Sequence, residues 1–349
     1  MEQPKKSNLF RTVITIVVSL AIAVFFMWLA LRGLEFRKIA SYFENANYWW
    51  VSAAAVFGLL AYWFRAVRWN LLLQPLGYQI SNSNSFWTIS FGYLMNLTIP
   101  RSGELARATA LFGVEKVPVE KSFGTIILER VVDLICMLGF LGLTLIFKYK
   151  AILAFYHYVT EEKGKSTAQQ SGNGMYLIVV AGVVLLLLFL VFRKKLAKFP
   201  LYGKVVEFAQ GILHGLTSIF KLKQKVRFIL LSVAIWVCYY FAAYLVCFSL
   251  PETSDFTFAD GFFIIVVGTL GMMVPASGGI GAFHFALKLG IMALYLSMGK
   301  SPVQGGEVGL SYAFISHTMQ LVIMVVMGVI SIPILARERS KMLHQKQQS

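Results

Sequence analysis

The chain has 349 residues, of which 58% are apolar and 14% are charged, whereas about 25% of a soluble domain is charged. With a mean hydropathy of +0.69, this composition excludes an ordinary soluble domain and predicts a polytopic membrane protein. The net charge of +16 does not indicate nucleic-acid binding. Lysines and arginines cluster beside the ends of apolar runs, as topology signals and contacts with anionic lipids do.

Six apolar runs reach the length of about 20 residues that a helix needs to cross a bilayer. The first is too long for the apolar core of a signal peptide and lacks a cleavage site, so it predicts a membrane helix. In chain order the runs are Val13–Leu31, Trp50–Leu72, Phe123–Phe147, Met175–Phe192, Phe228–Leu250 and Val308–Leu335.

Two further apolar segments, about Ser85–Phe112 and Gly261–Met298, are interrupted in the middle. The first break is centred on Pro100 and the second on Pro275, which follows it by 175 residues, about half of the chain. Proline and glycine free backbone groups that lipid cannot satisfy. Matched interruptions in two halves of a membrane protein indicate the binding site of a transporter.

Loop charges predict the orientation of the chain. Basic residues crowd the connection 193–227 and the tail after the last run, whereas Pro251–Asp260 carries acidic residues alone. The positive-inside rule therefore places both termini and the basic loop in the cytoplasm. Arg32, Arg37 and Lys38 then lie outside, against the rule. With these sides, the broken segments are favoured as hairpins that open to opposite sides, although two more full crossings remain an alternative.

The predicted fold class is an all-α integral membrane protein, with about six spans and two re-entrant hairpins related as an inverted repeat. We expect a single membrane domain over residues 1–349, with one half at about 1–150 and the other at about 175–336. Within the basic loop, apolar residues recur at helical spacing over Lys204–Lys221. This pattern predicts an amphipathic helix at a surface of anionic lipids.

The first break is unusually polar. Asn96, Arg101, Glu104 and Arg107 lie close together, and the last three are spaced three residues apart. If a helix resumes after Pro100, these three share one face. Its amino terminus and two guanidinium groups then form a candidate site for an anion such as phosphate. The alternative is an ion-pair cluster that only holds the hairpin together.

Glu129, Arg130 and Asp133 lie inside an otherwise apolar run, with both carboxylates on one helical face. Charges at this depth need a partner or water, and we expect Arg101 and Arg107 to be these partners. A purely structural ion pair and a role in moving a substrate or a proton are weighed equally.

Arg65 and Arg68, beside Trp63 and Trp69, are interpreted mainly as cations that extend to the membrane interface next to an aromatic belt. A contact with a lipid headgroup is the alternative.

The second break carries little charge. Pro275, Gly278, Gly279 and Gly281 predict a backbone that approaches a ligand or a partner helix closely. His284, one of two histidines within the apolar runs, is a candidate proton relay; packing is the alternative.

The sequence has no motif for a catalytic nucleophile, a metal or a cofactor. Cys136, Cys238 and Cys247 all lie within apolar runs and are expected to be packing residues.

At these residues the chain resembles the flippase-like family that includes the membrane domain of bacterial lysylphosphatidylglycerol synthases. The resemblance rests on the following motifs: Arg65-x-x-Arg68-Trp69, Asn96-x-x-x-Pro100-x-x-Gly103-Glu104-x-x-Arg107, Glu129-Arg130-x-x-Asp133 and Pro275-x-x-Gly278-Gly279-x-Gly281. It implies a protein of the cytoplasmic membrane whose domain moves lipids between leaflets. It also implies a functional core of Arg101, Glu104, Arg107, Glu129, Arg130 and Asp133.

Two departures from the family pattern matter. Members tend to carry Glu where this chain has His284, and the soluble domain that transfers lysine is not expected here. We therefore predict a non-enzymatic translocase for a phospholipid or lipid-linked substrate. The alternatives are a membrane partner of a lipid- or glycan-modifying enzyme, and a carrier of small molecules or ions.

Overall fold

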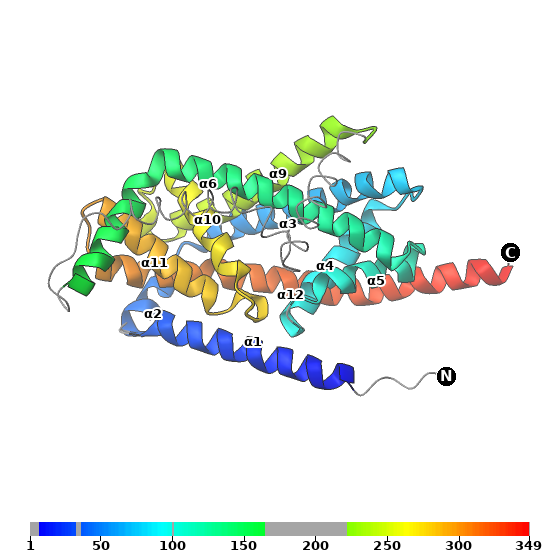
Figure 1. Ribbon diagram of the computed structural model, residues 1–349, viewed down its shortest axis with the longest axis horizontal. Coiled ribbons are helices and arrows are strands. Elements are labelled where there is room, and N and C mark those ends of the chain that lie inside the picture. Colours follow the sequence, from blue (N-terminus) through cyan, green and yellow to red (C-terminus); the bar gives the residue numbers. More distant parts are fainter. Residues whose placement is uncertain (1–6, 33–35, 100, 165–221, 349) are drawn as a thin grey trace, which may run out of the picture. The chain divides into compact units, whose positions relative to one another are not determined.

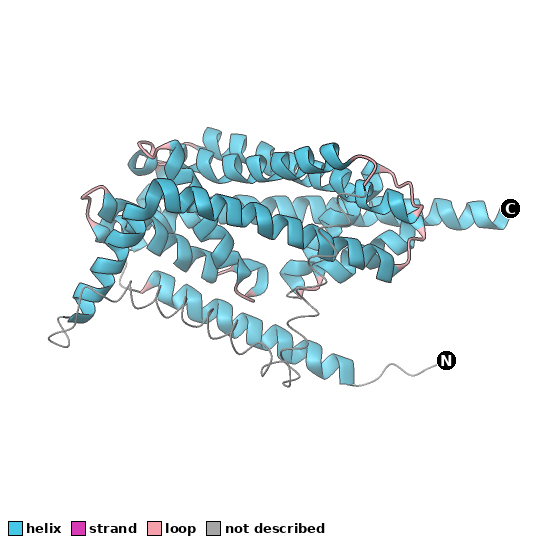
Figure 2. Cartoon of the chain, turned by 45° about the horizontal axis from the view of Figure 1, so that its top comes forward, coloured by secondary structure: helices cyan, strands magenta, loops and turns pink. Residues whose placement is uncertain are grey.

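The computed structural model describes residues 7–32, 36–99, 101–164 and 222–348. Within these ranges the chain is helical and contains no strand (Figure 2). Contacts divide it into two units, one made of Met1–Ala154 and Leu222–Ser349 and the other of Phe155–Lys221. The predicted span Met175–Phe192, the surface helix Lys204–Lys221 and Pro100 lie outside the described residues.

Apart from α2 (Phe36–Glu44), the described helices overlap the predicted apolar runs and interrupted segments, and Figure 1 shows their arrangement. The long helices are α1 (Ser7–Leu31), α3 (Tyr48–Leu73), α6 (Val119–Gly164), α9 (Lys225–Tyr244) and α12 (Pro302–Gln348). The shorter ones are α2 (Phe36–Glu44), α4 (Asn82–Thr98), α5 (Gly103–Glu115), α10 (Phe258–Met273) and α11 (Ala282–Ser297). Short 3₁₀ turns are η1 (Gln74–Leu76), η2 (Leu245–Ser249), η3 (Pro251–Thr253) and η4 (Ser277–Gly279).

Five described segments are long and apolar enough to cross a bilayer: Tyr48–Leu76, Val119–Tyr158, Lys225–Ser249, Ser277–Ser297 and Pro302–His344. Large apolar side chains also point outward, among them Val24 and Ile146, each 68% exposed, and Leu230, 63% exposed. Such surfaces mark contact with lipid or with another protein. The chain is therefore a polytopic helical membrane protein, as predicted.

Both interrupted segments are hairpins rather than straight crossings. In the first, Asn84 near the start of α4 donates a hydrogen bond of 2.7 Å to Glu115 at the end of α5. In the second, Gly271 of α10 packs against the start of α11, and Gly290 further along α11 packs against Val267. Each pair of helices is therefore antiparallel, and its two outer ends lie together.

Prolines account for where each hairpin turns. The residue before a proline is pushed out of the helical region, and Ile99 and Val274 both have extended backbone angles. Helix α4 therefore ends at Thr98, and α10 ends at Met273.

Two groups of contacts surround the hairpins. An apolar core joins α3, α4, α5 and α6 through residues that include Trp69, Ile89, Leu111 and Ile126. Elsewhere α3 packs along α9, and α12 packs along α4 and α11. The order span, hairpin, span thus occurs twice, as α3 to α6 and as α9 to α12. The division into halves at about 1–150 and 175–336 stays a prediction.

Candidate functional site

A cluster of buried charges lies where α3, α5 and α6 meet. Arg65 and Arg68 lie three residues apart on one face of α3, and Arg107 comes from α5. On α6, Glu129 and Asp133 lie one turn apart. All five side chains are buried, with exposures between 0% and 9%.

Glu129 and Asp133 pair with different arginines at hydrogen-bond distance. Arg107 Nη1 lies 2.7 Å from Glu129 Oε2. Arg65 Nη2 lies 3.0 Å from Asp133 Oδ2, and Arg68 Nη2 lies 2.9 Å from Asp133 Oδ1. Arg68 Nη2 is also 3.7 Å from Glu129 Oε1. Charges without water need close, hydrogen-bonded partners, and this arrangement supplies them.

The expected partners were half right. Of the two expected partners, Arg107 pairs with Glu129, whereas Arg101 pairs with neither carboxylate. Asp133 pairs instead with Arg65 and Arg68. The interpretation of Arg65 and Arg68 as cations that extend to the interface is therefore wrong, since they are 2% and 0% exposed. The hairpin α4–α5 and helix α6 cover this end of α3, which leaves the carboxylates of α6 as the nearest partners.

Three neighbours of the cluster were not found from the sequence as polar partners. Tyr239 of α9 accepts a hydrogen bond of 2.9 Å from Arg65, and Ser232 accepts one of 3.2 Å from Arg68. The ring centroid of Trp69 lies 3.5 Å from the guanidinium carbon of Arg107. The sequence places Trp69 in an aromatic belt rather than in this cluster. Nothing in the spacing of Ser232 or Tyr239 distinguishes them from other residues of an apolar run.

The cluster has more positive charge than negative. Three buried arginines face two carboxylates, and several guanidinium nitrogens have no hydrogen-bond partner within the described residues: Arg65 Nε and Nη1, Arg68 Nε, and Arg107 Nε and Nη2. A buried donor without a partner costs about 1–3 kcal/mol. Among the described residues, Glu129 Oε1 is also buried without a hydrogen-bond partner, so the unpartnered donors of the cluster outnumber its unpartnered acceptor.

A polar cavity of about 70 Å³ opens beside Arg107. It lies between α4, α5 and α6, and the residues that line it are Ile89, Gly92, Tyr93, Asn96, Gly103, Glu104, Arg107 and Arg130. Arg130 is 45% exposed and lies 3.8 Å from Glu104 and 3.8 Å from Asp133. It therefore connects the buried cluster to the mouth of the cavity.

Helix α5 begins later than expected. It starts at Gly103, so Glu104 and Arg107 share a face of the helix as predicted, but Arg101 precedes it with a left-handed backbone (φ 59°). The backbone N–H of Gly103 donates 2.7 Å to Asn96 Oδ1. The expectation of three residues on one helical face is therefore wrong for Arg101, and Asn96 already occupies the first donor of the helix.

Glycines at the second break bring backbones together. At Gly281 (φ 82°) a β-carbon would lie 2.7 Å from the backbone nitrogen of Met27, so α1 packs directly on this turn. At Gly278 (φ 59°) it would meet Leu97 of the first hairpin at 2.9 Å. Of the two predicted uses of these glycines, the described contacts support close approach to partner helices. Pro275 follows Val274, the residue that caps the end of α10.

His284 lies at the start of α11 and is 3% exposed. Its Nδ1 accepts a hydrogen bond of 3.3 Å from the backbone of Gly281, and its ring centroid lies 5.0 Å from that of His317 and 4.4 Å from that of Phe314. These contacts stabilise the turn, and a proton relay at His284 stays a prediction.

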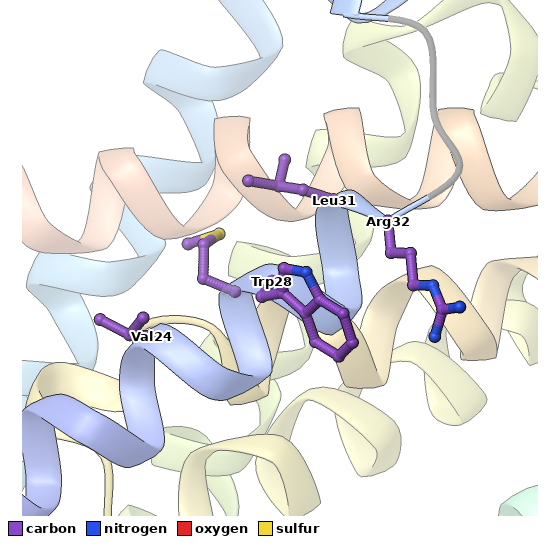
Figure 3. A pocket seen from close by; sticks show the side chains of 5 residues that line it. Val24, Trp28, Leu31 and Arg32 are labelled. Carbon is purple, nitrogen blue, oxygen red and sulfur yellow. The ribbon is translucent and has the colours of Figure 1, made fainter.

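A larger hollow of about 490 Å³ lies along α1 (Figure 3). It is lined by the apolar residues Val24, Met27, Trp28 and Leu31, with Arg32 at its end. A ligand site usually combines apolar walls with several converging polar groups. This hollow has one charged residue, whereas the cavity beside Arg107 has three, so the smaller cavity is the candidate site. Among the described residues there is no group that could hold a metal ion.

Residues 16–328 match the family model described as the lysylphosphatidylglycerol synthase TM region. The chain belongs to this family. The match spans the whole charge cluster and both breaks. Two curated relatives also match this chain, at 25% and 28% identity. No solved structure matches.

One relative is Glycosyltransferase AglD of Haloferax volcanii, 25% identical over 347 residues that cover 90% of this chain and 54% of AglD. The other is a UPF0104 membrane protein of Methanocaldococcus jannaschii, 28% identical over 138 residues that cover 39% of this chain and 40% of that protein. The chain therefore spans about half the length, or less, of the curated relatives it matches.

Proposed function

We propose that this protein moves a phospholipid or a lipid-linked substrate between the leaflets of a membrane. The phosphate would bind at the cavity lined by Arg107 and Arg130, while the acyl chains stay in lipid. The main support is the excess of buried, unpartnered guanidinium donors beside a polar cavity, inside a protein that spans a membrane. Arginine suits phosphate because its planar fork can donate two hydrogen bonds.

Each residue of the cluster has a part in this proposal. Arg107 and Arg130 bind the phosphate, and Glu104, Glu129 and Asp133 position the arginines and balance their charge. Arg65 and Arg68 hold Asp133 from the side of α3. Asn96 holds the start of α5 at the wall of the cavity.

The topology is part of the same proposal. Both termini lie in the cytoplasm, the membrane is the cytoplasmic membrane of the cell, and the hairpins open to opposite sides. The basic loop 193–227 contacts anionic lipids. An inverted arrangement of two halves allows one site to be reached from either side in turn.

A leaflet-accessibility assay in liposomes tests the proposal. The purified protein is reconstituted with a fluorescent phosphatidylglycerol, and the fraction of the label that an impermeant quencher reaches is followed with time. Arg130→Gln removes a half-exposed cation at the cavity mouth without opening the buried core. We expect it to slow lipid movement at least about tenfold, the effect of losing about 1.4 kcal/mol of binding.

The matched control is Arg339→Gln, an exposed arginine in the last part of α12, which we expect to leave the rate unchanged. Wild-type rates for both Arg130→Gln and Arg107→Lys would refute the assignment of the site.

A second candidate function is a membrane partner of a glycan- or lipid-modifying enzyme. The supporting observation is that this chain matches 54% of AglD, which is named as a glycosyltransferase. Co-purification of such an enzyme in fixed proportion, with no lipid movement by the protein alone, would favour this function.

A further inference from the structure

The tips of the two hairpins touch each other through Arg101. Its Nη2 donates a hydrogen bond of 3.1 Å to the backbone oxygen of Met273, 172 residues away in the chain. Beside this bond, Gly278 packs against Leu97 of the first hairpin. The contact therefore joins the first break directly to the second.

The acceptor is a carbonyl at the end of a helix. Met273 is the last residue of α10, and the last carbonyls of a helix lack an intrahelical partner and carry its negative partial charge. A guanidinium group suits this position. Arg101 thus caps α10 from the opposite hairpin.

Arg101 is held less firmly than the buried arginines. It is exposed, and within the described residues its side chain makes this single hydrogen bond and no ion pair. Its backbone is in the left-handed region, which costs a non-glycine residue free energy and often occurs at functional sites. It lies two residues before Gly103, which lines the polar cavity. Its guanidinium group is therefore an exposed cation that can exchange its partner close to the residues that line the cavity.

We propose that the hydrogen bond from Arg101 to Met273 is a latch that holds the two hairpin tips together. The phosphate of the substrate opens this latch by binding the guanidinium group of Arg101. A charge-assisted, bidentate bond to phosphate is stronger than a single bond to a neutral carbonyl. An anionic headgroup that arrives at the cavity competes with Met273 for the guanidinium group, and the tips separate. This inference rests on the proposed function and adds the step that couples substrate binding to opening.

Ser277 provides a probe of the contact. It is 7% exposed, and its hydroxyl lies 3.2 Å from that of Ser19 in α1. It adjoins Gly278, which packs on Leu97, so we expect separation of the tips to raise its accessibility from the side of the first hairpin. Ser277→Cys is made in a background where Cys136, Cys238 and Cys247 are alanine. In detergent without anionic lipid, we expect slow labelling by an impermeant maleimide. Phosphatidylglycerol is expected to raise the rate several-fold, and phosphatidylcholine or inorganic phosphate at the same concentration is not.

Arg101→Asn removes the guanidinium group and tolerates the left-handed backbone. We expect it to label rapidly at Ser277→Cys even without anionic lipid, and Arg101→Lys to restore part of the protection. Ser249→Cys is the control, because Ser249 is buried in η2, in the connection that precedes α10 rather than at the hairpin tips. It should label slowly in every background.

Equal labelling of Ser277→Cys in the wild-type and Arg101→Asn backgrounds would overturn the latch, as would parallel acceleration at Ser249→Cys. Acceleration by inorganic phosphate as strong as that by lipid would refute the headgroup as the releasing anion. These measurements need no lipid movement, so failure of the latch is distinct from failure of the transport assay with Arg130→Gln.

Discussion

The two hairpins share a geometry and differ in chemistry. Each has antiparallel helices that turn at a proline break, and the tips touch. Around α4 and α5 the neighbours are arginines and carboxylates in buried pairs. Around α10 and α11, glycines and histidines pack against α1 and α12. Among the described residues the charges there are fewer: Asp260 pairs with Lys148 at 2.6 Å, and Lys288 donates to the carbonyl oxygens of Ala30 and Arg32. The same hairpin geometry thus carries a dense charge cluster in one place and mainly close backbone packing in the other.

The largest expected effect on stability comes from removing a carboxylate of the buried charge cluster beside the first hairpin. Glu129→Gln leaves the buried Arg107 without a counter-charge and leaves Arg68 with Asp133 alone. Breaking a buried pair from one side costs about 3–5 kcal/mol. Thermal unfolding in detergent measures the loss.

The control is Glu104→Gln. Its carboxylate lies 3.8 Å from the half-exposed Arg130, so the loss should be below about 1 kcal/mol. Equal losses in the two variants would mean that the buried cluster is not what stabilises this hairpin.

The next effect concerns the second hairpin. Gly281→Ala places a β-carbon against the backbone of α1 at a positive φ, and we expect it to destabilise the protein by about 3 kcal/mol.

Gly299→Ala is the matched control, since Gly299 has φ 71° but no neighbour within 4 Å of a β-carbon. It should cost about 1 kcal/mol, for the backbone alone. Similar costs for both changes would argue against close packing of α1 on this turn.

The smallest expected effect on stability is that of a substitution at His284, in the second hairpin. His284→Asn keeps an acceptor near the backbone N–H of Gly281 but removes the ring contacts with Phe314 and His317. If the second hairpin serves packing, the loss should be about 1 kcal/mol. Lipid movement should then follow the same pH profile as in the wild type.

A pH profile altered in His284→Asn, with stability retained, would instead support the predicted proton relay.

Much of this architecture could be read from local pattern. The apolar helices among the described residues and both breaks follow from hydropathy and proline, and helical spacing made Arg107 one of two candidate partners for the carboxylates of α6. The partners of Asp133 could not be read in this way. Arg65 and Arg68 lie near the end of an apolar run. At such a position the local sequence is the same whether the arginine extends to the membrane interface or is buried between helices.

The sequence by itself determined the membrane class, the helical fold and the two places where the chain breaks, because these depend on residues close together in the chain. The tertiary structure decided which charges pair, where the cavity opens and that Arg101 reaches Met273. These depend on distances between helices far apart in the sequence, and a buried charge takes whichever partner the packing brings near.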